Sequence, residues 1–460
     1  ILTLCRNPPM AIMRDMDDWP AGAIGAGEGL SAMLGEAIIA DDLTGAGDSG
    51  VHFALAGKPT ALLLDHNALA EALRDHQAVA LSSESRFLGP EAAAAAARRA
   101  ADRCRAAGVR IAFKKIDSTL RGNLGAEIEA VLDAGGGGAA LVCPAMPKTG
   151  RVCRNGVLLL HGGPVHETAI GRDPFNPLPC SSVAGMLAAQ TRLPFANLGL
   201  EAVHSGAGAL RNAVGKMLEA GKRLIVADAE TDADLAALGK LLREANRIRG
   251  FPALLPVGAG GLAEAVAGSV RLSSGPELRG RMLAVVGSLA EASLSQIASA
   301  LASGAFHPLE LDMGLAFENP AGEVSRLVAE LPDAGKRHLL LKNRALPRPG
   351  KSVDAGDGIR AAGIFGEAAR AVCLAGGCSL LYVAGGSTAA AVAASLGLRR
   401  LTLERECLPG VVFSSCPGRG AVPRWFVSKA GGFGDSGVIV KIAAGISRDA
   451  PPLRPDAAGS

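Results

Sequence analysis

Short runs of aliphatic and β-branched residues alternate along the chain with longer alanine-rich stretches of helical periodicity. This alternation is typical of a parallel sheet whose strands are joined by helices. Between residues 144 and 179 six prolines and several glycines interrupt it, which predicts a hairpin and loops. In the first half the predicted strands are 37–40, 60–64, 78–81, 111–115, 139–143 and 224–227, and the predicted helices are 48–56, 68–75, 91–107, 125–132 and 232–245.

A second series of the same kind follows a Ser-Ser-Gly-Pro stretch at residues 273–276. We therefore expect two α/β domains in series, 37–270 and 282–446, joined by a linker at 271–281, with a ligand cleft between them. Residues 1–36 lack periodicity and predict a poorly ordered extension, and residues 447–460, which hold three prolines, predict a flexible tail. The strands predicted in the second half are 282–286, 338–342, 380–383 and 425–428, and the helices are 293–303, 359–373, 388–396 and 437–444.

Composition excludes several classes of protein. Hydrophobic residues make up 49% and charged residues 20%, which excludes a wholly disordered chain, and a net charge of +3 with 3% aromatics argues against nucleic-acid binding. The nine cysteines and eight histidines include neither Cys-x-x-Cys nor His-Glu-x-x-His, so spacing predicts no disulfide framework and no zinc site, and a reducing, cytoplasmic location fits. The uncharged stretch 371–398 is broken by glycines and is interpreted as helix, strand, turn and helix instead of a membrane span.

The first polar motif, Ala-Asp-Asp-Leu-Thr-Gly-Ala-Gly-Asp-Ser-Gly at residues 40–50, follows the first predicted strand. Open α/β sheets bind ligands at such strand ends. Gly45, Gly47 and Gly50 also fit the Gly-x-Gly-x-x-Gly pattern of dinucleotide sites. Two acids at the mouth of the turn would repel a pyrophosphate, and four residues separate the strand from the first glycine. A simple helix N-cap with solvated acids is the other alternative.

The second motif, Lys-Lys-Ile-Asp-Ser-Thr-Leu-Arg-Gly-Asn at residues 114–123, ends the fourth predicted strand. Its density of short polar groups suits a small oxygenated anion, because Arg121 can grip a carboxylate with two parallel bonds and the hydroxyls can bind sugar oxygens. Ser-Glu-Ser-Arg at residues 83–86 adds another arginine to the same sheet edge. Each segment also has a purely structural alternative. In the second motif Asp117 would cap a turn beside solvated lysines, and residues 83–86 would form a surface turn.

Three glycine turns of the second half each follow a predicted strand and lead into a helix. Backbone N–H groups at helix N-termini bind anions, and glycine lets a phosphate approach the chain. No Walker-type Gly-x-x-x-x-Gly-Lys motif occurs, so three turns on one edge predict a triphosphate site of another kind, unless they are ordinary strand–helix turns. The turns are Gly287-Ser288, Gly385-Gly386-Ser387-Thr388 and Lys429-Ala430-Gly431-Gly432-Phe433-Gly434.

These segments resemble the four-carbon acid sugar kinases, in which a sugar-binding domain precedes a nucleotide-binding domain. The likeness covers residues 37–446 and includes Gly150-Arg151, Asn155-Gly156 and Arg172-Asp173-Pro174 in the proline-rich excursion. It implies ATP-dependent phosphorylation of the terminal hydroxyl of a four-carbon sugar acid. Two motifs resemble the D-threonate and D-erythronate branch more than the 3-oxo-tetronate branch. They are Lys-Lys-Ile-Asp-Ser-Thr-Leu-Arg-Gly-Asn and Lys-Ala-Gly-Gly-Phe-Gly. Ser387 stands where an acid is common in the family.

The resemblance and the motifs together define an expected mechanism, with Mg²⁺ bridging the ATP phosphates. An aspartate of the first motif would accept the hydroxyl proton, and the choice among Asp41, Asp42 and Asp48 is left open. Expected partners are a sugar acid and ATP, without nucleic acid or membrane; a homo-oligomer and a resident metal site are left open. Other enzyme or binding classes also remain: an NAD-dependent oxidoreductase using the first glycines, or a non-catalytic sugar-acid sensor. Expected substrate contacts are Thr44, Arg86, Lys114, Lys115, Asp117, Ser118, Thr119 and Arg121, and expected ATP contacts are Ser288, Gly385, Gly386, Ser387, Thr388, Lys429, Gly431 and Gly432.

Overall fold

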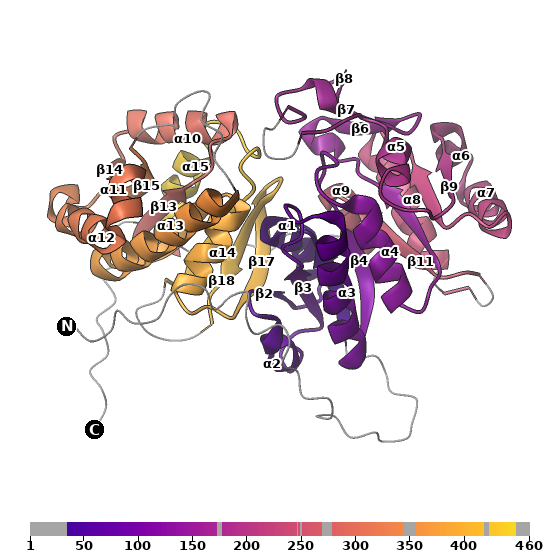
Figure 1. Cartoon of the computed structure of the whole chain (residues 1–460), viewed down its shortest axis with the longest axis horizontal. Helices are drawn as coiled ribbons and strands as arrows, with labels where there is room; N and C mark the ends of the chain where they lie inside the picture. The colour runs from indigo at the N-terminus through magenta and orange to yellow at the C-terminus, as the bar shows by residue number, and fades with distance from the viewer. Residues whose placement is uncertain are drawn as a thin grey trace.

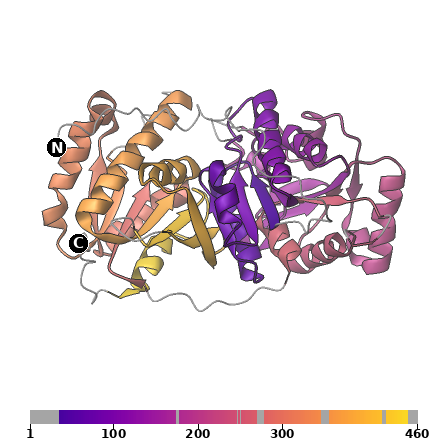
Figure 2. The same ribbon diagram turned by 90° about the horizontal axis from the view of Figure 1, so that it is seen from below.

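The computed structural model has two α/β domains that lie side by side and share one large sheet (Figures 1 and 2). The expected two-domain α/β organisation is therefore confirmed. Nearly all of the predicted N-terminal extension and C-terminal tail, and most of the predicted linker, lie outside the described residues. The described residues are 35–172, 177–245, 247–248, 251–268, 278–344, 355–417 and 423–447.

Parallel strands form the N-terminal domain's part of the sheet, in the order β2-β3-β1-β4-β11-β5-β10-β9. Both sheet faces are covered, because Ile38 packs in one core cluster with Phe53 of helix α1 whereas Ile39 packs in another with Ala97 of helix α3. The strands are β1 (Gly35–Ala40), β2 (Thr60–Leu63), β3 (Ala78–Ser82), β4 (Val109–Lys115), β5 (Ala139–Cys143), β9 (Phe195–Leu198), β10 (Leu224–Ala227) and β11 (Leu254–Gly258). The helices are α1 (Leu43–Leu55), α2 (Leu69–Ala72), α3 (Pro90–Ala106), α4 (Leu124–Ala134), α5 (Val183–Ala188), α6 (Leu200–His204), α7 (Ala207–Glu219), α8 (Asp232–Ala245) and α9 (Gly260–Ala267).

The proline-rich excursion forms a small antiparallel sheet of β6 (Arg151–Arg154), β7 (Val157–Leu160) and β8 (Gly163–Pro164). The predicted hairpin is therefore confirmed. Its turn is anchored to the end of β10, because the Asp228 carboxylate accepts bonds of 2.8 Å from the backbone N–H groups of Asn155 and Gly156. Asp173 and Pro174 of the family-like motif lie outside the described residues.

The C-terminal domain continues the sheet in the order β14-β15-β13-β16-β19-β18-β17. Its first five strands are parallel, and four of them were predicted. Strand β14 and the antiparallel strands β18 and β17 were not predicted. The strands are β13 (Arg281–Val286), β14 (Phe306–Leu311), β15 (His338–Asn343), β16 (Cys378–Ala384), β17 (Arg400–Leu408), β18 (Val411–Ser415) and β19 (Trp425–Lys429), with a separate pair β12 (Leu278–Arg279) and β20 (Ile446–Ser447). The helices are α10 (Glu291–Ala302), α11 (Met313–Glu318), α12 (Pro320–Ala329), α13 (Ala355–Gly376), α14 (Gly386–Ser395) and α15 (Val438–Ala444).

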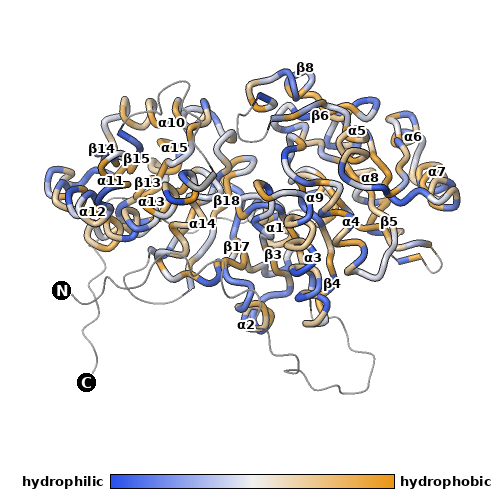
Figure 3. Tube along the Cα trace, viewed as in Figure 1, coloured by the Kyte–Doolittle hydropathy of each residue, from blue (hydrophilic) through white to orange (hydrophobic). Residues whose placement is uncertain are grey.

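Hydrophobic residues follow the central strands, whereas hydrophilic residues gather on outer helices such as α7 and α12 (Figure 3). The glycine-broken stretch 371–398 contains the end of α13, strand β16 and helix α14, as predicted. Among the described helices, none has both the length and the apolar character needed to cross a membrane.

The two domains are joined edge to edge, because β17 pairs antiparallel with β2 from Leu403 opposite Thr60 to Arg400 opposite Leu63. The result is one 15-stranded sheet. Helix α1 crosses this junction and packs on β17 as well as on β2 and β3 (Figure 1).

The glycines of the first motif lie within helix α1, which begins at Leu43, not at residue 48 as expected. A Cβ on Gly50 would lie 2.7 Å from both Ala80 Cβ and Leu403 Cδ1, so this glycine permits close packing on β3 and β17. The dinucleotide interpretation of this motif is wrong, because the pattern forms no phosphate-binding loop. Its N–H groups beyond the first turn are used by the helix itself.

Candidate functional site

The polar motifs of the N-terminal domain meet at one sheet edge, where the parallel strands β1, β3 and β4 end. Arg86, which follows β3, binds Asp41 through two bonds, Nε to Oδ2 at 2.7 Å and Nη2 to Oδ1 at 3.0 Å. Its Nη1 donates to Asp42 Oδ2 at 2.8 Å, and Nη2 lies 3.6 Å from Asp117 Oδ1. A single buried guanidinium thus holds the carboxylates of both motifs together.

Asp42 also caps helix α1. Its Oδ1 accepts the Gly45 N–H at 2.8 Å, and its Oδ2 accepts the Thr44 hydroxyl at 2.7 Å. Burial alone would raise the pKa of Asp41, but the charge and hydrogen bonds of Arg86 outweigh burial and hold that pKa below its ordinary value. Both aspartates are therefore occupied with fixed partners.

The turn after β4 is built around Asp117. Its Oδ2 accepts Arg121 Nε at 2.9 Å, the N–H groups of Thr119 and Arg121 at 3.3 Å, and the Thr119 hydroxyl. Burial opposes ionisation, but Arg121 and Arg86 hold the pKa of Asp117 well below its ordinary value. Ser118 is buried in the same turn. The predicted anion-binding turn is thus a rigid, internally bonded loop.

The two lysines of β4 have different environments. Lys114 is fully buried and donates to Glu127 Oε2 at 2.7 Å, and Ser85 donates to Glu127 Oε1 at 2.9 Å. Lys115 has no ion pair of this kind among the described residues, and its Nζ donates to the Ile116 carbonyl at 3.0 Å. A Cβ on Gly45 would lie 3.1 Å from Lys115 Nζ, so this ammonium lies against the first turn of α1.

Asp48 lies on α1 one turn beyond Thr44 and Gly45 and is 7% exposed. Its Oδ1 has no hydrogen-bond partner within the described part of the chain. A Cβ on Gly260, the first residue of α9, would lie 2.7 Å from Oδ2. Burial raises the pKa of Asp48, and Lys115 opposes that rise. Among the three aspartates that the sequence proposed as bases, Asp48 alone combines a free oxygen with a raised pKa.

The three glycine turns of the C-terminal domain also meet, beyond the ends of β13, β16 and β19. Gly385, with φ of 111°, donates its N–H to the Lys429 carbonyl at 2.9 Å. A Cβ on Gly287 would lie 2.5 Å from Thr388 Oγ1, and a Cβ on Gly431 would collide with the Ser288 side chain. The turns are therefore packed against one another so closely that side chains on these glycines would not fit.

The last turn is also held from α10 and by its own lysine. Ser293 donates to the Gly431 carbonyl at 2.9 Å, and Gln296 Nε2 donates to the Phe433 carbonyl at 3.0 Å. Lys429 is fully buried, and its ammonium donates at 2.9 Å to the carbonyls of Ala430 and Gly431. Burial lowers the pKa of Lys429 to about 7.

The polar sites of the two domains face each other. A Cβ on Gly386, at the start of α14, would lie 3.2 Å from Asp42 Oδ2 and 3.6 Å from Thr44 Oγ1. The guanidinium of Arg151 lies 4.8 Å from the centre of the Phe433 ring. The first-motif acids thus lie at the positive end of a helix from the other domain.

Arg151 was not among the predicted site residues. It is buried, and burial is the main cause of its lowered pKa, while Asp117 and Asp48 act in the opposite direction. It comes from the proline-rich excursion, where Gly150-Arg151 was the only signal in the sequence.

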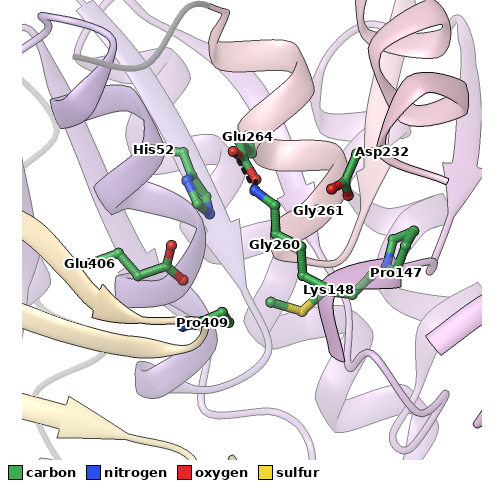
Figure 4. Close-up of a pocket in the computed structure, with 10 residues that line it drawn as sticks. His52, Pro147, Lys148, Asp232, Gly260, Gly261, Glu264, Glu406 and Pro409 are labelled. Atoms are coloured by element: carbon green, nitrogen blue, oxygen red, sulfur yellow. Dashed lines mark hydrogen bonds and ion pairs between the residues drawn. The ribbon is translucent and has the colours of Figure 1, made fainter. Parts of the chain in front are cut away.

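A small pocket, partly open to solvent, lies beside this site at the domain junction (Figure 4). His52 comes from α1, Glu406 from β17 and Glu264 from α9. The ammonium of Lys148 lies 2.6 Å from Glu264 Oε2. None of the predicted substrate or ATP contacts lines this pocket, which extends the site toward residues that sequence analysis missed.

Comparisons with known proteins agree with this division. Residues 37–266 match the model of a sugar-binding N-terminal domain, and residues 283–439 match that of a nucleotide-binding C-terminal domain. A D-threonate kinase from Bordetella bronchiseptica is 34% identical over 89% of this chain and 96% of its own length. A D-erythronate kinase from Heliobacterium modesticaldum is 31% identical over 87% of this chain and 94% of its own length. A crystal structure from Salmonella typhimurium LT2 has the same fold, with a TM-score of 0.70 and 22% identity over 89% of this chain and 99% of its own.

Proposed function

The chain belongs to the four-carbon acid sugar kinases, the family with a sugar-binding N-terminal and a nucleotide-binding C-terminal domain, and we propose that it transfers the γ-phosphoryl group of ATP to the terminal hydroxyl of D-threonate or D-erythronate. The observation that carries this proposal is the apposition of Gly386 with Asp42 and Thr44. Phosphoryl transfer needs donor and acceptor sites within direct reach.

The sugar acid is proposed to bind between the Asp117 turn and the start of α1. Lys115 supplies a cation that has no carboxylate ion pair among the described residues, and Arg121, Ser118, Thr119 and Thr44 are proposed to add donors around it. Arg86 and Lys114 act as positioning residues in this proposal, because their charges are held by the aspartates and by Glu127. Arg151 adds a buried guanidinium on the side of the C-terminal domain.

Asp48 is the proposed general base that accepts the proton of the terminal hydroxyl. Its support is the Oδ1 atom, which has no hydrogen-bond partner among the described residues, and the raised pKa, in contrast to the ion-paired Asp41 and the helix-capping Asp42. A base with a free oxygen and a pKa nearer neutrality takes up a proton more readily than one held by a guanidinium.

ATP is proposed to bind as MgATP in the three glycine turns, with Lys429 beside its phosphates. Support comes from the close packing of the turns at Ser288, Gly385 to Thr388, Gly431 and Gly432. Gly386 begins α14, and the first N–H groups of a helix have no partner within the helix itself. Closure of the two domains would then exclude water from the γ-phosphate. A cytoplasmic location, where ATP is abundant, is part of the proposal.

A coupled assay of ADP release with D-threonate, D-erythronate and 3-oxo-tetronate tests this function. We expect ADP release with D-threonate or D-erythronate and little with 3-oxo-tetronate, although 3-oxo-tetronate kinases are also among the relatives, at 31% identity for one from Methylobacterium radiotolerans. Turnover of 3-oxo-tetronate alone would move the chain to that branch. Binding of a sugar acid without ADP release would support the sensor alternative, and no response to any of the acids would refute the proposed substrate class.

A further inference from the structure

Three potential metal ligands meet across the domain junction, beside the pocket of Figure 4. Asp48 and His52 lie four residues apart on one face of α1, and Glu406 comes from β17 of the other domain. One ligand atom from each lies within 4.8 Å of the others. Figure 4 shows His52 and Glu406 on the same side of the pocket, opposite the Lys148–Glu264 ion pair.

The polar atoms of this group have unsatisfied bonding capacity. Within the described residues, Asp48 Oδ1 and His52 Nδ1 are buried and have no hydrogen-bond partner, and the two residues are only 7% and 2% exposed. Buried polar atoms almost always have a partner, so two orphaned atoms on successive turns of one helix require an explanation. Glu406 uses Oε1 to accept the Gly410 N–H at 2.7 Å, which orients its carboxylate and leaves the second oxygen for a ligand.

Cations also surround this group. Lys148 is paired with Glu264, and Lys115 donates to the Ile116 carbonyl. Lys115 and Arg151 both attract Asp48, so a bound dication would compete with these two cations for its carboxylate.

We propose that Asp48, His52 and Glu406 bind one transition-metal dication of the Zn²⁺ class and thereby link helix α1 to β17. One imidazole and two carboxylates are a borderline donor set that suits Zn²⁺, Mn²⁺ or Co²⁺, whereas Mg²⁺ prefers oxygen ligands and keeps its waters. Three tetrahedral ligands about 2.0–2.2 Å from a metal lie about 3.3–3.6 Å apart, so the side chains need to close by up to about 1.5 Å.

A metal here would also affect the reaction, a consequence that rests on the proposed role of Asp48. A dication bound by Asp48 occupies the lone pair that would accept the substrate proton, so a Zn²⁺-loaded enzyme is inhibited. This ion is separate from the Mg²⁺ that accompanies ATP. Through it, kinase activity would fall as the concentration of available transition metal rises.

Direct binding tests the proposal without any need for activity. The untagged full-length protein is freed of metal with a chelator, dialysed against Zn²⁺, Mn²⁺ or Mg²⁺, and analysed for bound metal and for unfolding temperature. We expect about one Zn²⁺ per chain, a higher unfolding temperature with Zn²⁺, and at least tenfold weaker binding in both His52→Gln and Glu406→Gln. Glu404→Gln, on the same strand but bonded to Ser415, is the matched control and should bind like the wild type.

Equal Zn²⁺ binding by the wild type and both variants, or no binding at micromolar Zn²⁺, would overturn the metal site. Circular dichroism establishes that each variant folds, and Glu406→Gln carries the test if His52→Gln does not. Zn²⁺ inhibition in the ADP assay under excess MgATP should be weaker in His52→Gln than in the wild type. Zn²⁺ binding without any kinase activity would leave the metal site standing while refuting the proposed function.

Discussion

Binding of ATP should take up a proton at Lys429. The side chain is fully buried, it bonds only to backbone carbonyls among the described residues, and burial lowers its pKa to about 7. Above that pH the free protein holds a neutral amine. A polyphosphate beside the amine favours the charged form and raises its pKa, so the complex holds one proton more than the free protein. The affinity for MgATP should therefore be highest near and below pH 7 and fall as the pH rises.

The size of the effect follows from the two pKa values. If bound phosphates restore the ordinary value of about 10.4, the affinity falls about 50-fold between pH 7 and pH 9. Isothermal titration calorimetry of MgATP in buffers of different ionisation enthalpy measures both the affinity and the proton taken up. Lys429→Met should remove the proton uptake and flatten the pH dependence, whereas Lys441→Gln, which removes an exposed lysine of α15 paired with Asp435, should change neither. A pH-independent affinity in the wild type, or equal slopes in the wild type and Lys429→Met, would refute the reasoning.

Three further predictions concern the N-terminal domain. Asp48→Asn should lower turnover about 10²- to 10⁴-fold with little change in MgATP affinity, and near-normal turnover in the ADP assay would remove Asp48 as the base. Arg86→Ala leaves two buried aspartates unpaired and should lower the free energy of unfolding by about 3–5 kcal/mol in denaturant titrations, so an unchanged midpoint would contradict the assigned pairing. Gly50→Ala should cost about 1–3 kcal/mol, because its Cβ would lie 2.7 Å from Ala80 Cβ. The matched Gly208→Ala, on open α7 surface, should be neutral or stabilising, and equal effects of the two would be inconsistent with the packing argument.

Local patterns in the sequence determined much of the fold. The predicted strands 139–143 and 224–227 and the predicted helix 232–245 coincide with β5, β10 and α8. Continuous apolar runs and helical periodicity are local properties, so short segments encode them without reference to the rest of the chain. Parallel strands place their carboxyl ends on one edge, and for the same reason the convergence of Asp41, Arg86 and Asp117 could be predicted.

Only the tertiary structure decided how those residues are paired and where the domains join. Strand β17 mixes charged and apolar residues and was not predicted, yet its pairing with β2 makes the sheet continuous and brings Glu406 to His52. The glycines that resembled a dinucleotide loop serve helix packing because of neighbours on β3 and β17. The availability of Asp48, in contrast to Asp41, and the near-neutral pKa of Lys429 arise from burial. Burial depends on contacts between segments hundreds of residues apart, and local sequence patterns do not contain that information.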